Sequence, residues 1–207
     1  MSTLETIKNL DSEVNQIFEQ INFVKQISNN LLKILPSFNI ADRSILSYGL
    51  KPHIRSVAWL VEQVIVQQTK YNKKLLGIDE VNFDLPDTCL HDFEIYANNQ
   101  IYYVNVKTHQ STGKKNKNDI SAVEKLYSQY CVKPDYNLLY LCMGIKFDDI
   151  TISFEQDQTI VFSAQFLPIY VNPRNDKIQA YYQHENQIRT RQEFLNEIIS
   201  RSKSIKL

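Results

Sequence analysis

The sequence predicts a mixed α/β domain built around one central sheet, and three observations support this fold class. Apolar residues recur at three- and four-residue steps through residues 4–35, as in a long amphipathic helix. The period changes to two in residues 93–107, which indicates strands. The run "YNLLYLCMGI" (136–145) is almost wholly apolar, as in a strand buried on both faces. Helices, then a hairpin, a helix, further strands and a last helix favour a mixed sheet flanked by helices.

The first two helices are predicted from their apolar stripes and their end signals. The helix over 4–35 has Ser2 and Glu5 as a capping box and is stopped by Pro36. Its long stripe indicates either core packing or a dimer contact. A second helix is expected over 52–71, with Pro52 in its first turn. Glu62 lies beside the buried stripe of that helix, and alone it would be an ordinary solvated glutamate.

The remaining elements follow in order. The strands "FEIYA" and "IYYVNVK" are separated by the turn-forming "NNQ" and predict an antiparallel hairpin. Capping boxes at Ser121 with Glu124 and at Thr190 with Glu193 predict helices over 121–131 and 190–202. Between these helices we expect the buried strand 136–145 and two more strands, "DITISFE" and "TIVFSAQFLPIYV", joined by a turn at 156–158.

Composition limits the classes of function. The 207 residues are 43% hydrophobic and 22% charged, and Lys plus Arg equals Asp plus Glu at 23 each. Zero net charge argues against a general nucleic-acid coat or a membrane-surface protein, but it permits a locally basic DNA-binding cleft. Three scattered cysteines fit a reducing, cytoplasmic location. The polar start "MSTLETIKNL" is unlike a secretory signal, and no apolar run of about 18 residues predicts a membrane span.

Acidic, amide and basic side chains converge on the predicted hairpin. Asp92 and Glu94 share one face of its first strand, and Asn105 and Lys107 share one face of its second. Folding the strands together brings Asp92 close to Asn105 and Lys107. The following segment, "THQSTGKKNKN", adds Lys114, Lys115 and Lys117 and contains no acid before Asp119, a composition suited to phosphates.

This combination of groups suits phosphodiester hydrolysis. Mg²⁺ is held by one or two carboxylates together with waters and phosphate oxygens. A lysine beside the ion can hold the attacking water and stabilise the pentavalent phosphate.

The stretch "HDFEIYANNQIYYVNVK" resembles the catalytic hairpin of the PD-(D/E)XK nucleases. The thirteen-residue step from Asp92 to Asn105, followed by x-Lys, is similar to the type II restriction endonucleases of the EcoRV and HincII branch. "KTHQS" resembles their DNA-contacting loop, "YVNPRNDKIQAYY" their base-recognition segment, and "IRTRQEFLNEII" their closing helix. The tail is also similar to that of an octanucleotide-cutting enzyme of this class. Residues 54–203 are covered.

The resemblance implies a role for each matching residue. Asp92 would be the metal-bridging carboxylate, position 105 the second metal ligand, Lys107 the catalytic lysine, and Glu62 an acidic helix residue that supports a metal or its water. The implied cofactor is Mg²⁺, with Mn²⁺ as a substitute. Within a single domain of 1–207, residues 1–36 would be a helical and possible dimerisation element, 52–162 a catalytic core, and 163–207 a recognition segment with a closing helix.

Two features depart from the family pattern. His91 replaces the proline of the motif, and Pro86-Asp87 is a rival motif that fits less well because Asp92 opens the strand. Asn105 replaces a carboxylate, and losing that charge weakens binding of a divalent ion. Three interpretations stay open: an inactive Asp-to-Asn form, a natural active enzyme in which Glu94 or Glu62 supplies the charge, and a naturally inactive relative.

Candidate DNA contacts come from two segments. Asn and Gln can bond adenine bidentately, and Arg and Lys can bond guanine. After the hairpin the candidates are Thr108, His109, Gln110, Ser111, Lys114 and Lys115, and in the tail they are Asn172, Arg174, Asn175, Lys177 and Gln179, with Arg189 and Arg191 expected to reach phosphates.

The expected function is sequence-specific, Mg²⁺-dependent hydrolysis of double-stranded palindromic DNA by a homodimer, since two-fold symmetry of a protein mirrors that of its site. A cognate DNA methyltransferase would act on the same site without needing to bind this chain. The alternatives are a non-cutting DNA-binding protein on the same scaffold and a repair or junction nuclease.

Overall fold

The computed structural model describes residues 3–48, 54–86, 88–110, 118–172, 174, 177–180 and 186–201. The helices are α1 (Thr3–Leu32), α2 (Ile54–Tyr71), α3 (Val123–Val132) and α4 (Arg191–Arg201), with the 3-10 turn η1 (Ala164–Phe166). The strands are β1 (Phe38–Asn39), β2 (Glu80–Asn82), β3 (Phe93–Ala97), β4 (Gln100–Gln110), β5 (Asn118–Ala122), β6 (Leu138–Asp148), β7 (Thr151–Ser163), β8 (Tyr170–Val171) and β9 (Lys177–Ala180).

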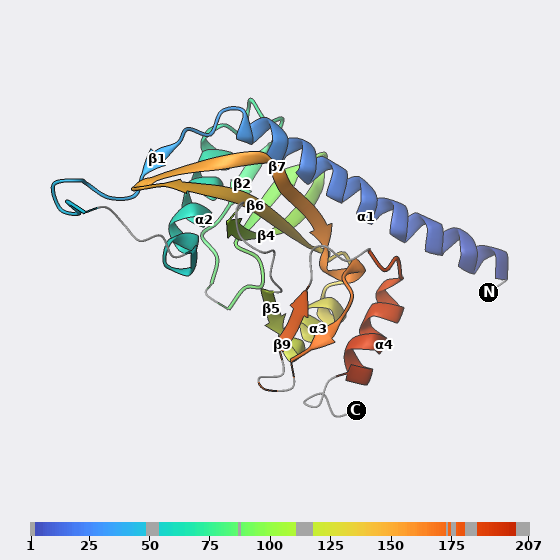
Figure 1. Ribbon diagram of the computed structural model, residues 1–207. Helices are drawn as coiled ribbons and strands as arrows, with labels where there is room; N and C mark the ends of the chain where they lie inside the picture. The colour runs from blue at the N-terminus through green and yellow to red at the C-terminus, as the bar shows by residue number, and fades with distance from the viewer. Residues whose placement is uncertain are drawn as a thin grey trace.

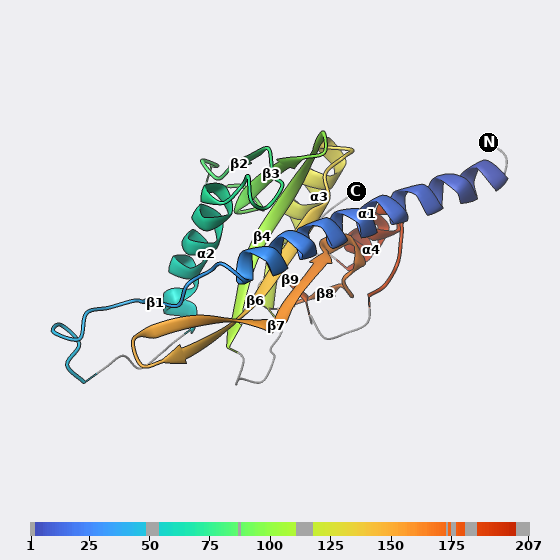
Figure 2. The same ribbon diagram turned by 90° about the horizontal axis from the view of Figure 1, so that it is seen from above.

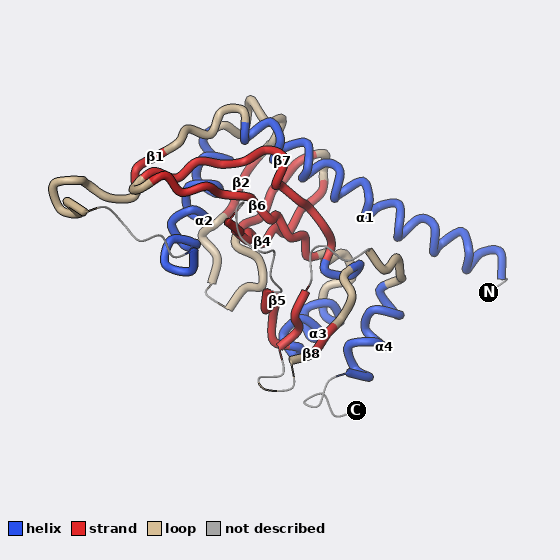
Figure 3. Tube along the Cα trace, in the orientation of Figure 1, coloured by secondary structure: helices blue, strands red, loops and turns tan. Residues whose placement is uncertain are grey.

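The main sheet is six-stranded and curled, with the order β1-β7-β6-β4-β3-β2 (Figure 1). The β4–β6 pair is parallel, and the other pairs of this sheet are antiparallel. A second sheet, β5-β9-β8, lies below it next to α3 (Figure 3). The predicted mixed α/β class, with a mixed central sheet and flanking helices, is therefore confirmed. In the described part of the chain, no helix is long and apolar enough to cross a membrane.

The two faces of the main sheet support separate apolar clusters, because successive side chains of a strand point to opposite faces. On β4, Tyr102, Val104 and Val106 join the cluster that contains the buried residues of α1 and α2. Tyr103 joins the cluster beneath α3 and α4. Asn105 and Lys107 lie on the same side of β4 as Tyr103. Both therefore point to the sheet face that carries the α3 and α4 cluster.

Helix α1 lies across the sheet over β7 and β6, and its N-terminal part extends past the body of the molecule (Figure 2). The described part of its stripe is buried at Ile17, Ile21, Val24, Ile27 and Leu31. The helix predicted over 4–35 is confirmed, although it ends at Leu32, where turn hydrogen bonds to the Leu31 carbonyl take over. Core packing accounts for this part of the stripe, and the dimer contact stays a prediction.

The hairpin is formed as predicted. Phe93 pairs with Val104 and Ala97 with Gln100. The turn needs only Asn98 and Asn99, which have φ values of 52° and 58°. Asparagine tolerates this left-handed region well, and two such residues make the tight turn that suits the twist of paired strands.

Several predicted boundaries were wrong. The strand expected to continue to Val171 ends at Ser163, where η1 follows. The strands expected on either side of a turn at 156–158 are one long strand, β7, which pairs with β6 through a large irregularity between Cys142 and Gly144. Ser121 belongs to β5, so α3 begins at Val123 without the expected capping box. The box at α4 is confirmed, since the Glu193 carboxylate accepts from the Thr190 amide at 2.8 Å and the Thr190 hydroxyl accepts from the Glu193 amide at 3.2 Å.

Candidate functional site

The hairpin places Asp92 directly beside Asn105. The Asp92 amide donates to the Val104 carbonyl at 2.9 Å, which extends the pairing by one residue beyond β3. Asp92 Oδ2 accepts from the Val106 amide at 2.6 Å, and Oδ1 accepts from Asn105 Nδ2 at 3.2 Å. These two hydrogen bonds fix the carboxylate against β4, as the antiparallel register requires.

Asn105 is buried, and its two amide atoms have different surroundings. Nδ2 donates to the Leu90 carbonyl at 3.0 Å as well as to Asp92. Oδ1 is buried, and no donor among the described residues reaches it. An unsatisfied buried oxygen costs about 1–3 kcal/mol. This oxygen is therefore suited to coordinate a cation or to accept a hydrogen bond from a water molecule.

Lys107 lies two residues further along the same face of β4. It pairs with Cys142 across the parallel β4–β6 ladder, and its Nζ lies 5.9 Å from the centre of the Tyr140 ring. Its positive charge acts on both Asp92 and Glu62. Lys107 thus supplies a positive charge within electrostatic range of both carboxylates.

Glu62 completes this group from α2, which packs against β4. Burial and the negative charge of Asp92 raise the pKa of Glu62 to about 7, against the opposing effect of Lys107. Burial also raises the pKa of Asp92, whereas Lys107 and the Val106 amide counteract it. A carboxyl group that titrates near neutral pH beside a second carboxylate and a lysine is typical of functional sites. We call Glu62, Asp92, Asn105 and Lys107 the hairpin site.

Glu94, the other proposed source of negative charge, belongs to a neighbouring network. Its carboxylate accepts from the Tyr96 hydroxyl at 2.6 Å and from Asn82 Nδ2 at 3.1 Å, and it lies 3.3 Å from His91 Nε2. Burial alone would raise the pKa of Glu94, but these partners hold it below its ordinary value. His91 Nδ1 in turn lies 3.2 Å from the Tyr136 hydroxyl. Sequence reasoning missed this network, and only the i, i+2 spacing of Glu94 and Tyr96 hinted at it.

The hairpin site offers a hard divalent ion two carboxylates, from Glu62 and Asp92, and the unsatisfied oxygen of Asn105. One or two carboxylates with added waters are a usual set for Mg²⁺. The described residues contain no cluster of three or more His, Cys, Asp or Glu side chains of the kind that binds a metal unaided. The donors therefore fit a weakly held Mg²⁺ that gains further ligands from water and substrate.

The candidate DNA contacts after Lys107 are only partly described. β4 continues to Gln110, so Thr108 and His109 belong to a strand and not to the expected loop. His109 pairs with Gly144 of β6, and both candidate side chains are half-buried. The side chain of Gln110 and residues Ser111, Lys114 and Lys115 lie outside the described residues, as does the rival Asp87.

The tail segment folds into the second sheet. Asn172 Oδ1 accepts from the Arg174 amide at 3.1 Å, so its side chain serves a local turn. Arg174 and Lys177 are exposed. Asn175 and the side chain of Gln179 lie outside the described part of the chain.

The two arginines expected to reach phosphates have internal partners, and this expectation is corrected. Arg189 is 7% exposed; its guanidinium donates to Glu197 at 2.5 Å and to the Leu167 carbonyl. Arg191 donates to the carbonyls of Tyr130 at 2.7 Å and Tyr136 at 2.5 Å. Arg189 and Arg191 therefore stabilise the α3–α4 end of the fold.

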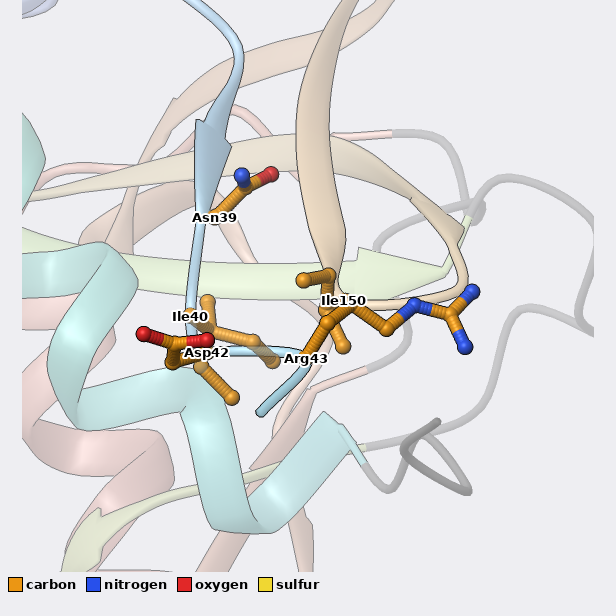
Figure 4. Close-up of a pocket in the computed structure, with 6 residues that line it drawn as sticks. Asn39, Ile40, Asp42, Arg43 and Ile150 are labelled. Carbon is orange, nitrogen blue, oxygen red and sulfur yellow. The ribbon is translucent and has the colours of Figure 1, made fainter. Parts of the chain in front are cut away.

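A hollow of about 550 Å³ lies away from the hairpin site, near the turn between β6 and β7 (Figure 4). It is lined by Asn39, Ile40, Ala41, Asp42, Arg43 and Ile150. The Asp42 carboxylate accepts from the Ser44 amide at 2.8 Å, and Arg43 forms an ion pair with Asp149. The charged side chains of this hollow thus have local partners.

No family model matches the chain, and a search of curated proteins finds no match.

Proposed function

We propose that the chain is a Mg²⁺-dependent endonuclease of the PD-(D/E)XK type that cleaves double-stranded DNA. The observation that carries the proposal is the hairpin site, where Glu62, with its pKa of about 7, joins Asp92, Asn105 and Lys107. The mixed sheet, with its antiparallel β3–β4 hairpin and parallel β4–β6 pair, is compatible with the restriction-endonuclease-like core that the sequence resemblance implies.

Each side chain has a role that suits phosphodiester hydrolysis. Asp92, Glu62 and the Asn105 oxygen would hold Mg²⁺, which when bound supplies positive charge at the scissile phosphate. Lys107 stabilises the charge that accumulates on the phosphate oxygens. The Glu62 carboxylate has a second oxygen, which can accept the proton of the attacking water. The water oxygen bonds to phosphorus as the bond to the leaving oxygen breaks.

Asn105 supports a second candidate function, a DNA-binding protein that does not cut. Its amide donates to Asp92, where a metal-binding Asp would add a second negative charge. With less negative charge at the site, a divalent ion is held more weakly. In this alternative the scaffold would bind DNA with the usual salt dependence of phosphate contacts, and Mg²⁺ would produce no cleavage. A repair or junction nuclease on the same scaffold is the third possibility, and it would prefer branched substrates.

The deciding experiment is a digest of plasmid and phage DNA in millimolar Mg²⁺, with the native chain and the Asn105→Asp variant compared side by side. Lys107→Met in each background is the matched control, because it removes the cation while keeping much of the side-chain volume. Discrete fragments from the native chain, lost with Lys107→Met, support an active enzyme. If only Asn105→Asp yields fragments, the native chain is a form of the nuclease that binds DNA without cutting it.

The proposal fails if neither protein yields fragments although both are folded by circular dichroism. Fragments that appear only with branched DNA would indicate the junction nuclease. We further propose that the active unit is a homodimer on a palindromic site, which analytical ultracentrifugation with a self-complementary duplex tests directly.

A further inference from the structure

Trp59 is the only tryptophan of the chain, and it lies exposed on α2. Its exposed fraction is 68%, although the helix buries Val57, Val61 and Ile65 on another face and Val66 two turns further along nearly the same face. Within the described residues, no aromatic ring or cation contacts the indole. Large aromatic side chains gain most from burial against a flat apolar partner, so an exposed indole at a site can serve as a contact surface.

Trp59 is a direct neighbour of the hairpin site. It precedes Glu62 by three residues, and residues three apart on a helix have Cβ atoms about 5–6 Å apart. At about 100° per residue, Glu62 falls between the buried stripe of Val61 and Ile65 and the exposed Trp59. The indole is therefore a helix neighbour of the carboxyl group whose pKa Asp92 and Lys107 affect.

The surroundings of Trp59 favour a small flat ligand over a second protein. The next exposed ring on this helix, Tyr71, is 84% exposed, and it lies about 18 Å further along the helix axis. The side chains between them include the polar Gln63, Gln67 and Lys70. A stable protein interface buries about 800 Å² on each partner with an apolar centre. The two aromatic rings of α2 are thus separate and form no continuous apolar patch.

We propose that Trp59 stacks on a nucleobase of the DNA strand whose phosphate lies in the hairpin site. This inference rests on the proposed nuclease function, because it takes the ligand to be DNA. A base and its phosphate are joined through one sugar, so a strand held by its phosphate at Lys107 presents bases close by. Stacking on an aromatic side chain needs no particular base, since every unpaired base has a π-face, and in a duplex the base must first leave the helical stack. Trp59 would therefore add affinity near the scissile phosphate without adding sequence specificity.

The indole itself reports the contact, because no other tryptophan contributes fluorescence. The full chain is titrated in EDTA, which prevents Mg²⁺-dependent cleavage, with three probes of equal length: a single-stranded oligonucleotide of mixed sequence, its duplex, and an abasic phosphodiester strand. We expect the single strand, and more weakly the duplex, to quench the fluorescence. The abasic strand has the same phosphates and no bases, so it should bind without quenching.

Matched variants test the contribution to affinity, measured by anisotropy of a labelled single strand. Trp59→Ala should weaken binding by about 10- to 100-fold, as expected for the loss of one stacked base. Trp59→Phe keeps an aromatic face and should restore most of the affinity. Tyr71→Ala removes the other exposed ring of α2 and should bind like the native chain.

The outcomes separate the two proposals. Quenching with reduced affinity of Trp59→Ala, without cleavage in Mg²⁺, supports the stacking contact and removes the nuclease. Cleavage with unchanged fluorescence and unchanged affinity of Trp59→Ala keeps the nuclease and overturns the stacking contact. The stacking contact is also overturned if Trp59 is shielded from acrylamide in the free protein and Trp59→Ala converts a dimer to a monomer. The indole would then pack against a second copy of the chain.

Discussion

The fold strongly changes the chemistry of the Glu62 carboxyl group. Its sequence neighbours form an ordinary amphipathic helix, and on a solvated helix its carboxyl group would titrate near 4.5. In the fold it is partly buried within electrostatic range of Asp92 and Lys107, and its pKa rises to about 7. The negative charge of Glu62 is therefore disfavoured in the folded state.

This raised pKa predicts a pH-dependent stability. A carboxyl group with a higher pKa in the folded state contributes stability fully below about pH 4.5, and this stability is lost as the pH rises through about 7. Glu62→Gln should therefore raise the free energy of unfolding by about 1–2 kcal/mol at pH 8 and change it little at pH 4. Urea denaturation at the two pH values measures this. An equal effect at both would show that the pKa of Glu62 is ordinary.

Asn105→Asp should make the stability of the fold depend on divalent ions. The variant loses the donations from Nδ2 to Leu90 and Asp92 and places a second carboxylate where Asn105 now lies 3.2 Å from Asp92. We expect a loss of about 2–4 kcal/mol without metal, because like charges and unsatisfied oxygens then face each other. Thermal unfolding with EDTA, Ca²⁺ and Mn²⁺ measures the recovery.

The native chain is the control for this comparison and should respond to the ions much less. If the two proteins gain equally from Ca²⁺ and Mn²⁺, position 105 does not contact the ion.

Residue spacing predicted the hairpin site better than the DNA contacts. Asp92, Asn105 and Lys107 could be placed together from the two-residue period alone, because strand pairing brings them to one face. Arg189 and Arg191 could not be placed, since an arginine near the start of a helix has the same local pattern whether it faces solvent or carbonyl groups. Their partners Leu167, Tyr130 and Tyr136 come from distant parts of the sequence.

Among the elements, β7 shows how a polar stretch can mislead. The residues "EQDQT" are typical of a turn, but β7 passes through them as a bulged strand. Gly144 on β6 makes this possible, because a Cβ there would lie 2.2 Å from the Cβ of Gln158. The local sequence could not show this, since the close approach involves two strands.

Gly144→Ala should therefore destabilise the β6–β7 pair by about 1–3 kcal/mol or more, as overpacking does in a closely packed fold. Gln158→Ala should not rescue it, because the overlap involves the Cβ atom that alanine retains. Gln158→Gly in the same chain should recover part of the loss, and a double-mutant cycle by urea denaturation measures the coupling. Additive effects of the two substitutions would contradict the close contact.

For the molecule as a whole, the main sheet contributes residues to both apolar clusters, one on each face. Leu31 of α1 belongs to one cluster and Phe194 of α4 to the other, and both are 1% exposed. A polar link also crosses the body, since Asn137 Nδ2 donates to Gln20 of α1 at 2.8 Å and the Ser163 hydroxyl donates to Asn137 Oδ1 at 2.5 Å. Strand β6 contributes buried side chains to both clusters.

Leu31→Ala and Phe194→Ala should each lower the stability of the entire fold, by about 2–5 and 3–5 kcal/mol respectively. Because the clusters share one sheet, Trp59 fluorescence and far-ultraviolet circular dichroism should report the same urea midpoint in each variant. Ile188→Ala, at a side chain that is 61% exposed, is the control and should change little. Separate midpoints for the two probes would show that the clusters unfold independently.

The position of α1 also has a consequence for synthesis of the chain on the ribosome. Its main packing partner, β7, follows it by on the order of 100 residues, which at a translation rate of about 5–20 residues per second emerge over roughly 5–20 s. During that interval the apolar stripe of α1 lacks its main packing partner. A nascent chain stalled before β7 should therefore be a stronger client for chaperones than one stalled after it.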